Sequence, residues 1–278
     1  MSGRFDGRRA VVTGASRGIG AGIAQRLAAE GADVVIVART LDKHKVLPGS
    51  LRETEAVLAQ YGGRVGVVVA DITDEESRAR IIPEAQEQLG GPIDILVNNA
   101  AAALTIPIDE ITARKQRLSF ECNVIAPLAL AQDVLPGMRA AGAGWIVNLT
   151  STGARLHPGP PFNLGPQGST MEVYGATKAA LNRVTSGLAG DLYGTGVRVN
   201  AVGPRVAVMS EGAAETIGDS LGSDLFEPTE KIVEAAVALC DCPVDTTGRI
   251  VVSLDLIEEL GIEVRGLDGM PRASRSAV

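Results

Sequence analysis

The chain of 278 residues carries 26 Lys and Arg against 33 Asp and Glu, so its formal net charge is −7. Hydrophobic residues make up 45% of it and charged residues 21%, which is the balance of a globular protein with a sizeable core. Nucleic acids and anionic membrane surfaces are bound by basic patches, so this acidic balance argues against both as partners.

The chain offers no sign of export or of a membrane span. No signal-like apolar stretch follows the basic N-terminal residues, and the apolar runs fall short of the ~20 residues that a membrane helix needs. The cysteines Cys122, Cys240 and Cys242 are too few for a disulfide framework and lack the spacing of a zinc site. We therefore expect a cytoplasmic protein with reduced thiols and no bound metal.

Short β-branched runs alternate with helical stretches along most of the chain. We expect strands over residues 9–14, 33–38, 64–70, 93–97, 145–149, 197–202 and 249–254. Helices are expected over residues 19–30, 51–61, 74–89, 112–140, 173–193 and 229–239, with Pro127 and Pro136 kinking or trimming the fourth. Strands that are apolar throughout are buried on both faces. The pattern predicts one α/β domain, residues 1–278, built on a Rossmann-type doubly wound parallel sheet of about seven strands with helices on both faces.

Three stretches interrupt this alternation: residues 40–50, the Pro- and Gly-rich residues 157–172, and residues 205–227. Long loops inside a compact α/β domain are often functional, so we predict that 157–172 and 205–227 are substrate loops. Our hypothesis is that the loop 157–172 forms a wall of the pocket. The tail 263–278 either frays or covers the pocket of a neighbouring subunit.

A glycine-rich turn joins the first expected strand to the first expected helix. Glycines let the backbone turn sharply and approach a pyrophosphate, which the free N–H groups and the dipole of the helix N-terminus stabilise. The spacing Gly-x-x-x-Gly-x-Gly differs from the Gly-x-Gly-x-x-Gly fingerprint, and an ordinary tight turn is the alternative. The predicted cofactor-binding residues of the turn are Gly14, Ser16, Arg17, Gly18, Ile19 and Gly20.

The choice of dinucleotide is made at the end of the second strand, where an acidic residue would hydrogen-bond the ribose of NAD. This chain has Arg39 there, and Arg17 lies in the glycine turn. Two guanidinium groups that converge on one spot suit the extra phosphate of NADP, whereas the alternative is that both are solvated surface residues. We predict NADP as the preferred cofactor, with NAD as the second choice.

Tyr174 and Lys178 lie four residues apart on one face of an expected helix. A free phenol has a pKa near ~10 and a nearby ammonium lowers it, so Tyr174 could act as acid and base at neutral pH. Ser151 follows the fifth strand at the carboxyl edge, where open α/β sheets bind ligands. Its hydroxyl could hold a substrate carbonyl oxygen beside the tyrosine.

With these features together, the chain resembles the compact single-domain short-chain dehydrogenases/reductases over residues 8–255. The resemblance implies a catalytic tetrad of Asn123, Ser151, Tyr174 and Lys178. It implies that Tyr174 gives or takes the proton and that Ser151 orients the carbonyl. In the same family the lysine binds the nicotinamide ribose and lowers the tyrosine pKa, and the asparagine holds a water of the proton relay.

The resemblance also extends to the remaining cofactor contacts. It implies that Asp71 and Ile72 hold the adenine and that Asn98 lies near the adenine ribose. Backbone groups of Val206 and Ala207 are expected to face the nicotinamide.

Three positions depart from the family pattern. Ala101 stands where Asn-Asn-Ala is followed by glycine, Arg205 follows Pro204 where the family has Pro-Gly, and Met209 replaces an expected threonine. Arg205 is either a basic anchor for an acidic substrate or the partner of a surface carboxylate such as Glu211.

The sequence thus predicts an NADP-preferring oxidoreductase that moves a hydride between the cofactor and a ketone or secondary alcohol. It acts on a small molecule, and family members commonly assemble as homotetramers or homodimers through their long helices. The rival interpretations are a dehydratase or epimerase that uses the nicotinamide transiently and a non-catalytic dinucleotide sensor. The sensor is disfavoured because both Tyr174 and Lys178 are present.

Overall fold

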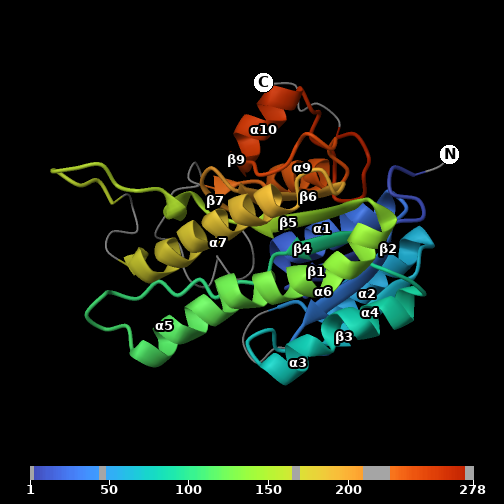
Figure 1. Ribbon diagram of the computed structural model, residues 1–278, viewed down its shortest axis with the longest axis horizontal. Coiled ribbons are helices and arrows are strands. Elements are labelled where there is room, and N and C mark those ends of the chain that lie inside the picture. Colours follow the sequence, from blue (N-terminus) through green and yellow to red (C-terminus); the bar gives the residue numbers. More distant parts are fainter. Residues whose placement is uncertain (1–2, 44–47, 165–169, 209–225, 273–278) are drawn as a thin grey trace.

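A seven-stranded parallel sheet forms the centre of the computed structural model, which describes residues 3–43, 48–164, 170–208 and 226–272. The strand order is β3-β2-β1-β4-β5-β6-β9, and helices cover both faces (Figure 1). The strands are β1 (Arg9–Thr13), β2 (Asp33–Ala38), β3 (Val65–Val69), β4 (Ile95–Asn98), β5 (Gly144–Leu149), β6 (Val197–Gly203) and β9 (Ile250–Val252). The predicted doubly wound sheet and its seven strands are confirmed.

Successive residues of each strand enter two separate cores, because side chains alternate across a strand. Val12 packs on one face and Val11 on the other. The first core is covered by α1 (Gly18–Ala29), α2 (Leu51–Leu58), α9 (Thr229–Leu239) and α10 (Ser253–Leu260). The second is covered by α4 (Ile81–Leu89), α6 (Ala126–Ala141) and α7 (Glu172–Asp191). Continuous apolar strands are therefore buried on both faces, as the sequence predicts.

Proline explains where the predicted helix 74–89 divides. It consists of α3 (Glu75–Ala79) and α4, separated at Arg80. Pro83 has no N–H for the carbonyl of Ala79 four residues earlier, and its ring crowds that carbonyl. The helix therefore breaks directly before the first turn of α4.

The predicted helix 112–140 keeps its length instead of being trimmed. Thr112 caps α5 (Ala113–Phe120), which continues through the π-helical turn η2 (Glu121–Ile125) into α6. The extra residue in the π turn falls just before Pro127, where the missing N–H weakens the ordinary ladder. By length and composition this 29-residue helix could cross a membrane, whereas the sequence analysis expected no apolar run of that length. Half of its most apolar window is buried inside the protein, as in a core helix.

Two small elements escaped the sequence analysis. The predicted strand 249–254 ends at Val252, and α10 begins immediately after it. A second, two-stranded parallel sheet pairs β7 (Ala207–Val208) with β8 (Phe226–Glu227). Both lie near the carboxyl end of β6, because Gly203 pairs with Val252 and β7 follows four residues after Gly203.

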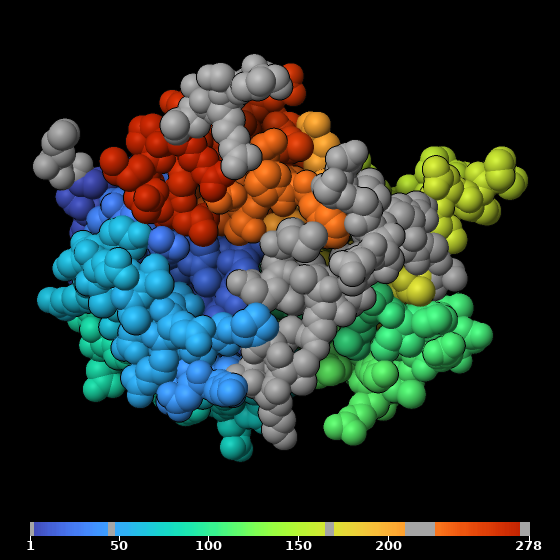
Figure 2. Space-filling view, turned by 180° about the vertical axis from the view of Figure 1, so that it is seen from behind, coloured from blue at the N-terminus to red at the C-terminus, as the bar shows by residue number. Residues whose placement is uncertain are grey.

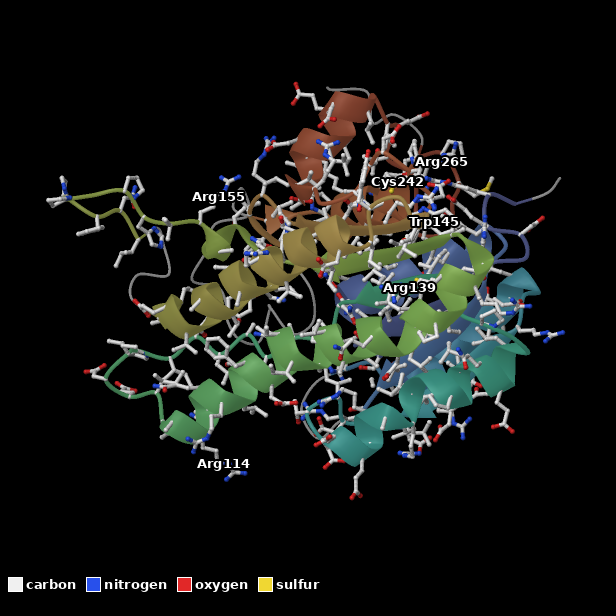
Figure 3. The ribbon with its side chains drawn as sticks, viewed as in Figure 1. Arg114, Arg139, Trp145, Arg155, Cys242 and Arg265 are labelled. Carbon is white, nitrogen blue, oxygen red and sulfur yellow. The ribbon has the colours of Figure 1, made fainter. Side chains whose placement is uncertain are left out.

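The arm, defined as residues 155–164, includes the first part of the predicted loop 157–172 and extends away from the body of the protein (Figure 1). Arg155 stands at its base, and η3 (Thr152–Ala154) precedes it (Figure 3). Leu156 and Phe162 are exposed, at 93% and 63%. The end of the loop approaches the body where the Thr170 carbonyl accepts from the Ile106 N–H. Residues 165–169 lie outside the described residues, and the pocket wall stays a prediction.

Trp145 and Cys242 meet at the amino end of β5 (Figure 3), where the indole Nε1 donates to the Cys242 carbonyl oxygen at 3.1 Å. The guanidinium groups of Arg8 and Arg198 each make a cation–π contact with the indole, at 4.7 and 4.6 Å from the ring centroid. All three cysteines are buried free thiols, as expected for reduced thiols.

The C-terminal segment packs on its own chain, against α1 and α9. Arg26 of α1, 1% exposed, donates to the carboxylates of Glu30 and Glu234 and, through Nη1, to the carbonyl of Gly266 at 3.1 Å. Glu234 also accepts from Arg265 N–H. The red C-terminal atoms accordingly lie against the blue N-terminal ones in Figure 2. Residues 263–272 thus pack on their own chain, and residues 273–278 lie outside the described residues. Whether the tail also covers the pocket of a neighbouring subunit stays a prediction.

Replacing Arg26 by Met should lower the free energy of unfolding by about 3 to 5 kcal/mol, because two buried carboxylates lose their cation. Urea unfolding measures this loss. Arg52→Met is the matched control, since Arg52 is exposed and pairs with Asp42 and Glu55 on the surface, and it should cost less than about 1 kcal/mol. Equal losses in the two variants would contradict the role given to Arg26.

Candidate active site

Five of the loops that hold predicted site residues leave the sheet at one edge. The segments after β1, β2, β3, β4 and β5 all lie at the carboxyl ends of parallel strands. This is the edge at which open α/β sheets bind their ligands. The segment after β6 joins them through the contact of Gly203 with Ser151 described below.

The glycine turn is held against the loop after β4 by hydrogen bonds between side chains and backbone. The Asn99 amide donates to the Thr13 carbonyl at 2.9 Å, and Thr13 Oγ1 accepts from the N–H groups of Asn99 and Ala100. A Cβ on Gly14, whose φ is +66°, would meet Ala100 Cα at 2.8 Å. A side chain at Gly14 is therefore excluded both by the conformation and by the space.

The start of α1 fits a phosphate. Its N-cap residue, Arg17, has extended φ and ψ and makes no side-chain cap hydrogen bond, and the first turn contains no acidic residue. N–H groups at a helix N-terminus and its dipole favour an anion. Gly18 has φ +57°, so the turn presents backbone in place of a side chain. The residues present thus fit a pyrophosphate at the predicted position.

The two arginines predicted to converge have different partners. Arg17 donates to the carbonyls of Pro48 and Gly49, at 2.6 and 2.9 Å. Arg39, 71% exposed, lies 3.7 Å from a carboxylate oxygen of Asp71. Arg17 thus holds the loop after β2 onto the glycine turn, while Arg39 is the guanidinium with a free outward face.

Asp71 is kept ionised by its neighbours. Burial opposes its charge, but hydrogen bonds from Thr73 and the guanidinium of Arg39 outweigh it, so the pKa of Asp71 lies below its ordinary value. Ile72 is buried in the second core and its side chain is not presented to a ligand. The predicted adenine pair therefore offers the Asp71 carboxylate and the backbone at Ile72.

The side chain of Asn98 is turned away from the edge of the sheet, so its backbone is what remains for the predicted contact near the ribose, which stays a prediction. Asn98 is 3% exposed, and its amide nitrogen donates to Asn148 Oδ1 at 2.9 Å and to the Pro127 carbonyl. The side chain points into the second core because residue 98 is still part of β4, whose side chains alternate. The next residue, Asn99, is the one that reaches the glycine turn.

Ser151, Tyr174 and Lys178 come together at the start of α7. Ser151 follows β5, and its hydroxyl lies near enough to the Tyr174 phenol to favour the ionised form of that phenol. Lys178 is 2% exposed, and its Nζ lies 5.7 Å from the centroid of the Tyr174 ring. The same nitrogen donates to the Leu149 carbonyl at 2.7 Å. The hydroxyl groups of Ser151 and Tyr174 thus lie close to the amino group of Lys178.

The expected lowering of the tyrosine pKa is not found. Burial raises the pKa of Tyr174 to about 12, and the hydrogen bond with Ser151 only partly opposes this. Burial also lowers the pKa of Lys178 to about 8, opposed by the Cys122 thiol. Loss of hydration penalises both charged forms, and it outweighs the attraction of an ammonium that is bound to the Leu149 carbonyl.

Asn123 joins the elements that carry the site. It lies in η2, fully buried, and its amide exchanges hydrogen bonds with both backbone groups of Ala102, at 2.8 and 3.1 Å. Its nitrogen also donates to Thr177 Oγ1, which in turn donates to the Tyr174 carbonyl. The side chain of Asn123 therefore fixes the loop after β4 and the catalytic turn of α7 relative to each other.

Two glycines allow the close approach of Ser151 and Tyr174. A Cβ on Gly175 would lie 2.5 Å from the Gly153 carbonyl oxygen, which would separate η3 from α7. A Cβ on Gly203 would lie 3.0 Å from Ser151 N. Each glycine is thus required by contact distance rather than by its φ angle.

The segment after β6 lies beside this group. Val206 and Ala207 are half-buried at this edge, and Ala207 pairs with Phe226 of β8. The Arg205 guanidinium pairs with Asp255 on the surface. Of the two predicted roles, substrate anchor and surface ion pair, the structure shows the ion pair, with Asp255 in place of Glu211. Glu211 and Met209 lie outside the described residues.

Sequence reasoning missed Asn99, Thr177 and Glu227 as residues that position the site. Asn99 had a signal, since it stands in the Asn-Asn-Ala stretch that ends the fourth strand. Thr177 had a weaker one, inside Tyr-x-x-x-Lys. Glu227 had none, because its contacts come from segments distant in the chain.

Comparison with known proteins gives one consistent result. The sequence model of the short chain dehydrogenases matches residues 8–217. "Hydroxysteroid dehydrogenase-like protein 2" of Danio rerio is 30% identical over 263 residues, covering 94% of this chain. The chain spans 60% of the length of that curated relative.

Two solved structures are similar along their whole length. A putative NAD(P) dependent gluconate 5-dehydrogenase from Beutenbergia cavernae, with bound NADP, is 29% identical with a TM-score of 0.75, covering 89% of this chain and 95% of its own. A 7α-hydroxysteroid dehydrogenase complexed with NADH and 7-oxo glycochenodeoxycholic acid is 27% identical with a TM-score of 0.77, covering 90% and 93%.

The buried ammonium should make stability depend on pH. Burial lowers the pKa of Lys178 to about 8 from 10.5, so between these values the unfolded chain holds a proton that the folded chain has released. The free energy of unfolding should therefore rise with pH in this window, by up to roughly 3 kcal/mol relative to Lys178→Met. Urea unfolding across the window measures it. Lys115→Met, at an exposed site, should track the wild type, and a constant gap between wild type and Lys178→Met would contradict the shift.

Proposed function

Because the chain belongs to the short-chain dehydrogenase/reductase family, we propose that it transfers a hydride between NADP and a ketone or secondary alcohol, with Tyr174 as the acid and base. The observation that carries this proposal is the proximity of the Ser151 hydroxyl to the Tyr174 phenol beside the buried Lys178. A protonated phenol and a second hydroxyl at one point form a two-donor site for a carbonyl oxygen. Such a site stabilises the charge that develops on that oxygen during reduction.

Each residue of the group has a separate task. Ser151 donates to the substrate carbonyl oxygen and fixes its direction. Tyr174 donates its proton to the same oxygen as it gains negative charge, and in the reverse direction it takes the proton of the alcohol. A tyrosine that keeps its proton at neutral pH is ready to act as the acid.

The bound nicotinamide supplies or accepts the hydride, which joins or leaves the carbon of the same carbonyl group. Lys178 would hold the ribose next to that ring, and a cationic ring nearby favours the phenolate of Tyr174. Asn123 keeps α7 at its distance from the loop after β4. Together these contacts hold the reacting groups in line, which removes much of the entropic barrier.

The preference for NADP rests on Arg39. It follows β2 where an acidic residue would select NAD, it is 71% exposed, and among the described residues Asp71 is its one ion-pair partner. A ribose phosphate could take up the free face of this guanidinium in a bidentate pair. The related structures hold NADP in one case and NADH in another, so Arg39 rather than kinship supports the choice.

The proposed substrate is an apolar cyclic or acyl ketone. One relative is named for hydroxysteroids, and another structure contains a bile-acid ketone. Met171, at the start of α7, has its methyl group near Gly153, which also lies close to the Ser151 hydroxyl. This apolar side chain beside Ser151 supports a largely apolar ligand.

The first test follows nicotinamide absorbance over a panel of steroid, acyl and small ketones with the matching alcohols. Tyr174→Phe should lower kcat by about 10²- to 10⁴-fold, because the proton donor is lost while the ring remains. Tyr193→Phe is the matched control, since Tyr193 is 73% exposed, and it should retain wild-type turnover. Full activity of Tyr174→Phe would overturn the assignment.

Cofactor choice is tested at Arg39. Arg39→Ala should raise KM for NADPH by about 10- to 100-fold, the loss of a charge-assisted contact, and leave KM for NADH unchanged. Arg52→Ala, also exposed and on the next helix, serves as the control and should change neither value. An equal effect of Arg39→Ala on both cofactors would sink the preference.

A further inference from the structure

Glu227 is a buried carboxylate that the proposed chemistry does not use. It ends β8 and is 2% exposed. Within the described ranges, no Lys, Arg or His nitrogen lies within 4.0 Å of its oxygens. A carboxylate without a cation loses its hydration and is retained only where hydrogen bonds replace the water.

Two such bonds join Glu227 to separate segments. Its Oε2 accepts from the Arg205 N–H at 3.0 Å, and its Oε1 accepts from the Ser253 hydroxyl at 2.6 Å. Arg205 follows β6, whereas Ser253 begins α10 directly after β9. One side chain therefore ties the exits of the last two strands of the main sheet to the small β7–β8 sheet.

These contacts lie next to the reacting groups. Gly203, the last residue of β6, is in close contact with Ser151. The chain continues through Pro204 and Arg205 to Val206 and Ala207, and Ala207 pairs with Phe226 beside Glu227. The position of the Val206–Ala207 backbone thus depends on how the turn at Arg205 is held.

This turn is also where the sequence leaves the family pattern. Where Pro-Gly is usual, this chain has Pro204–Arg205, and no residue other than glycine has a positive φ among those described. Arg205 therefore holds the turn in an ordinary conformation, with its N–H directed at a fixed acceptor. The guanidinium itself lies on the surface with Asp255.

We propose that Glu227 is a positioning residue for the nicotinamide end of the cofactor: through the Arg205 N–H and Ser253 it holds the backbone of Val206 and Ala207 at the site. The inference rests on the proposed function, since it presumes that a nicotinamide binds beside Tyr174. Glu227 itself touches no reacting atom.

The matched pair of variants is Glu227→Gln and Glu227→Leu. Glutamine can accept from the Arg205 N–H and donate to Ser253 Oγ, so it keeps both bonds without the charge. Leucine keeps the volume and loses both. Arg205→Ala retains the N–H and removes only the surface pair with Asp255, and serves as the control.

Two measurements are made on the whole protein. Hydrogen exchange of the peptide spanning residues 203–208, without cofactor, should be at least about tenfold faster in Glu227→Leu and unchanged in Glu227→Gln and Arg205→Ala. The Kd for NADPH, from its fluorescence, should rise about tenfold or more in Glu227→Leu only. Should Glu227→Leu fail to fold, Ser253→Ala removes one of the two bonds and should move both quantities in the same direction.

The outcomes separate this inference from the proposed function. A wild type that binds neither NADPH nor NADH overturns both. A wild type that binds, with Glu227→Leu or Ser253→Ala equal to it in exchange and in Kd, overturns the positioning role alone. Equal damage in Glu227→Gln and Glu227→Leu also overturns it, because the charge rather than the hydrogen bonds would then be responsible.

Discussion

The hydrogen bond from the Asn99 amide to the Thr13 carbonyl fixes the spacing between the first and fourth strands at the edge where the candidate site is built. It leaves no room for a Cβ at Gly14, so the turn that would meet a pyrophosphate is made of bare backbone. Similar constraints recur around the site, at Gly175 and Gly203. The arrangement of Ser151, Tyr174 and the glycine turn therefore depends on backbone contacts that no side chain could replace.

Burial sets the electrostatics of the same region. The Tyr174 phenol and the Lys178 amine are both shifted toward their neutral forms, and the ammonium is satisfied by the Leu149 carbonyl. The protonation of both groups is therefore sensitive to a bound ligand. A ligand that brings a positively charged ring or displaces water changes the pKa of the phenol and of the amine together. The proposed chemistry would draw on that sensitivity rather than on a preformed phenolate.

Features that depend on neighbouring residues were predicted from the sequence, whereas features that depend on residues distant along the chain were not. Strands such as 33–38 and the helix 229–239 were predicted to the residue, because alternating burial and helical period are local patterns. The tetrad residues were predicted from the resemblance to the family, and the structure links Asn123, through Thr177, to the group of Ser151, Tyr174 and Lys178. The burial of the Asn98 side chain was not predicted, because one residue of strand register decides which face a side chain takes. The roles of Arg26, Arg17 and Glu227 could not be predicted, since each depends on partners far along the chain.

The placement of Trp145 has a practical consequence for spectroscopy. It is the one tryptophan of the chain, and it lies at the amino end of β5 with the guanidinium groups of Arg8 and Arg198 in contact with its ring. Ser151 lies six residues further along, roughly 20 Å away at the rise of an extended strand. The fluorescence of Trp145 thus reports whether β5 and the turn at Cys242 remain packed together. The indole lies at the amino ends of the strands, whereas the reacting groups lie at the carboxyl ends. The protein carries its own unfolding probe, set apart from the edge at which a dinucleotide would bind.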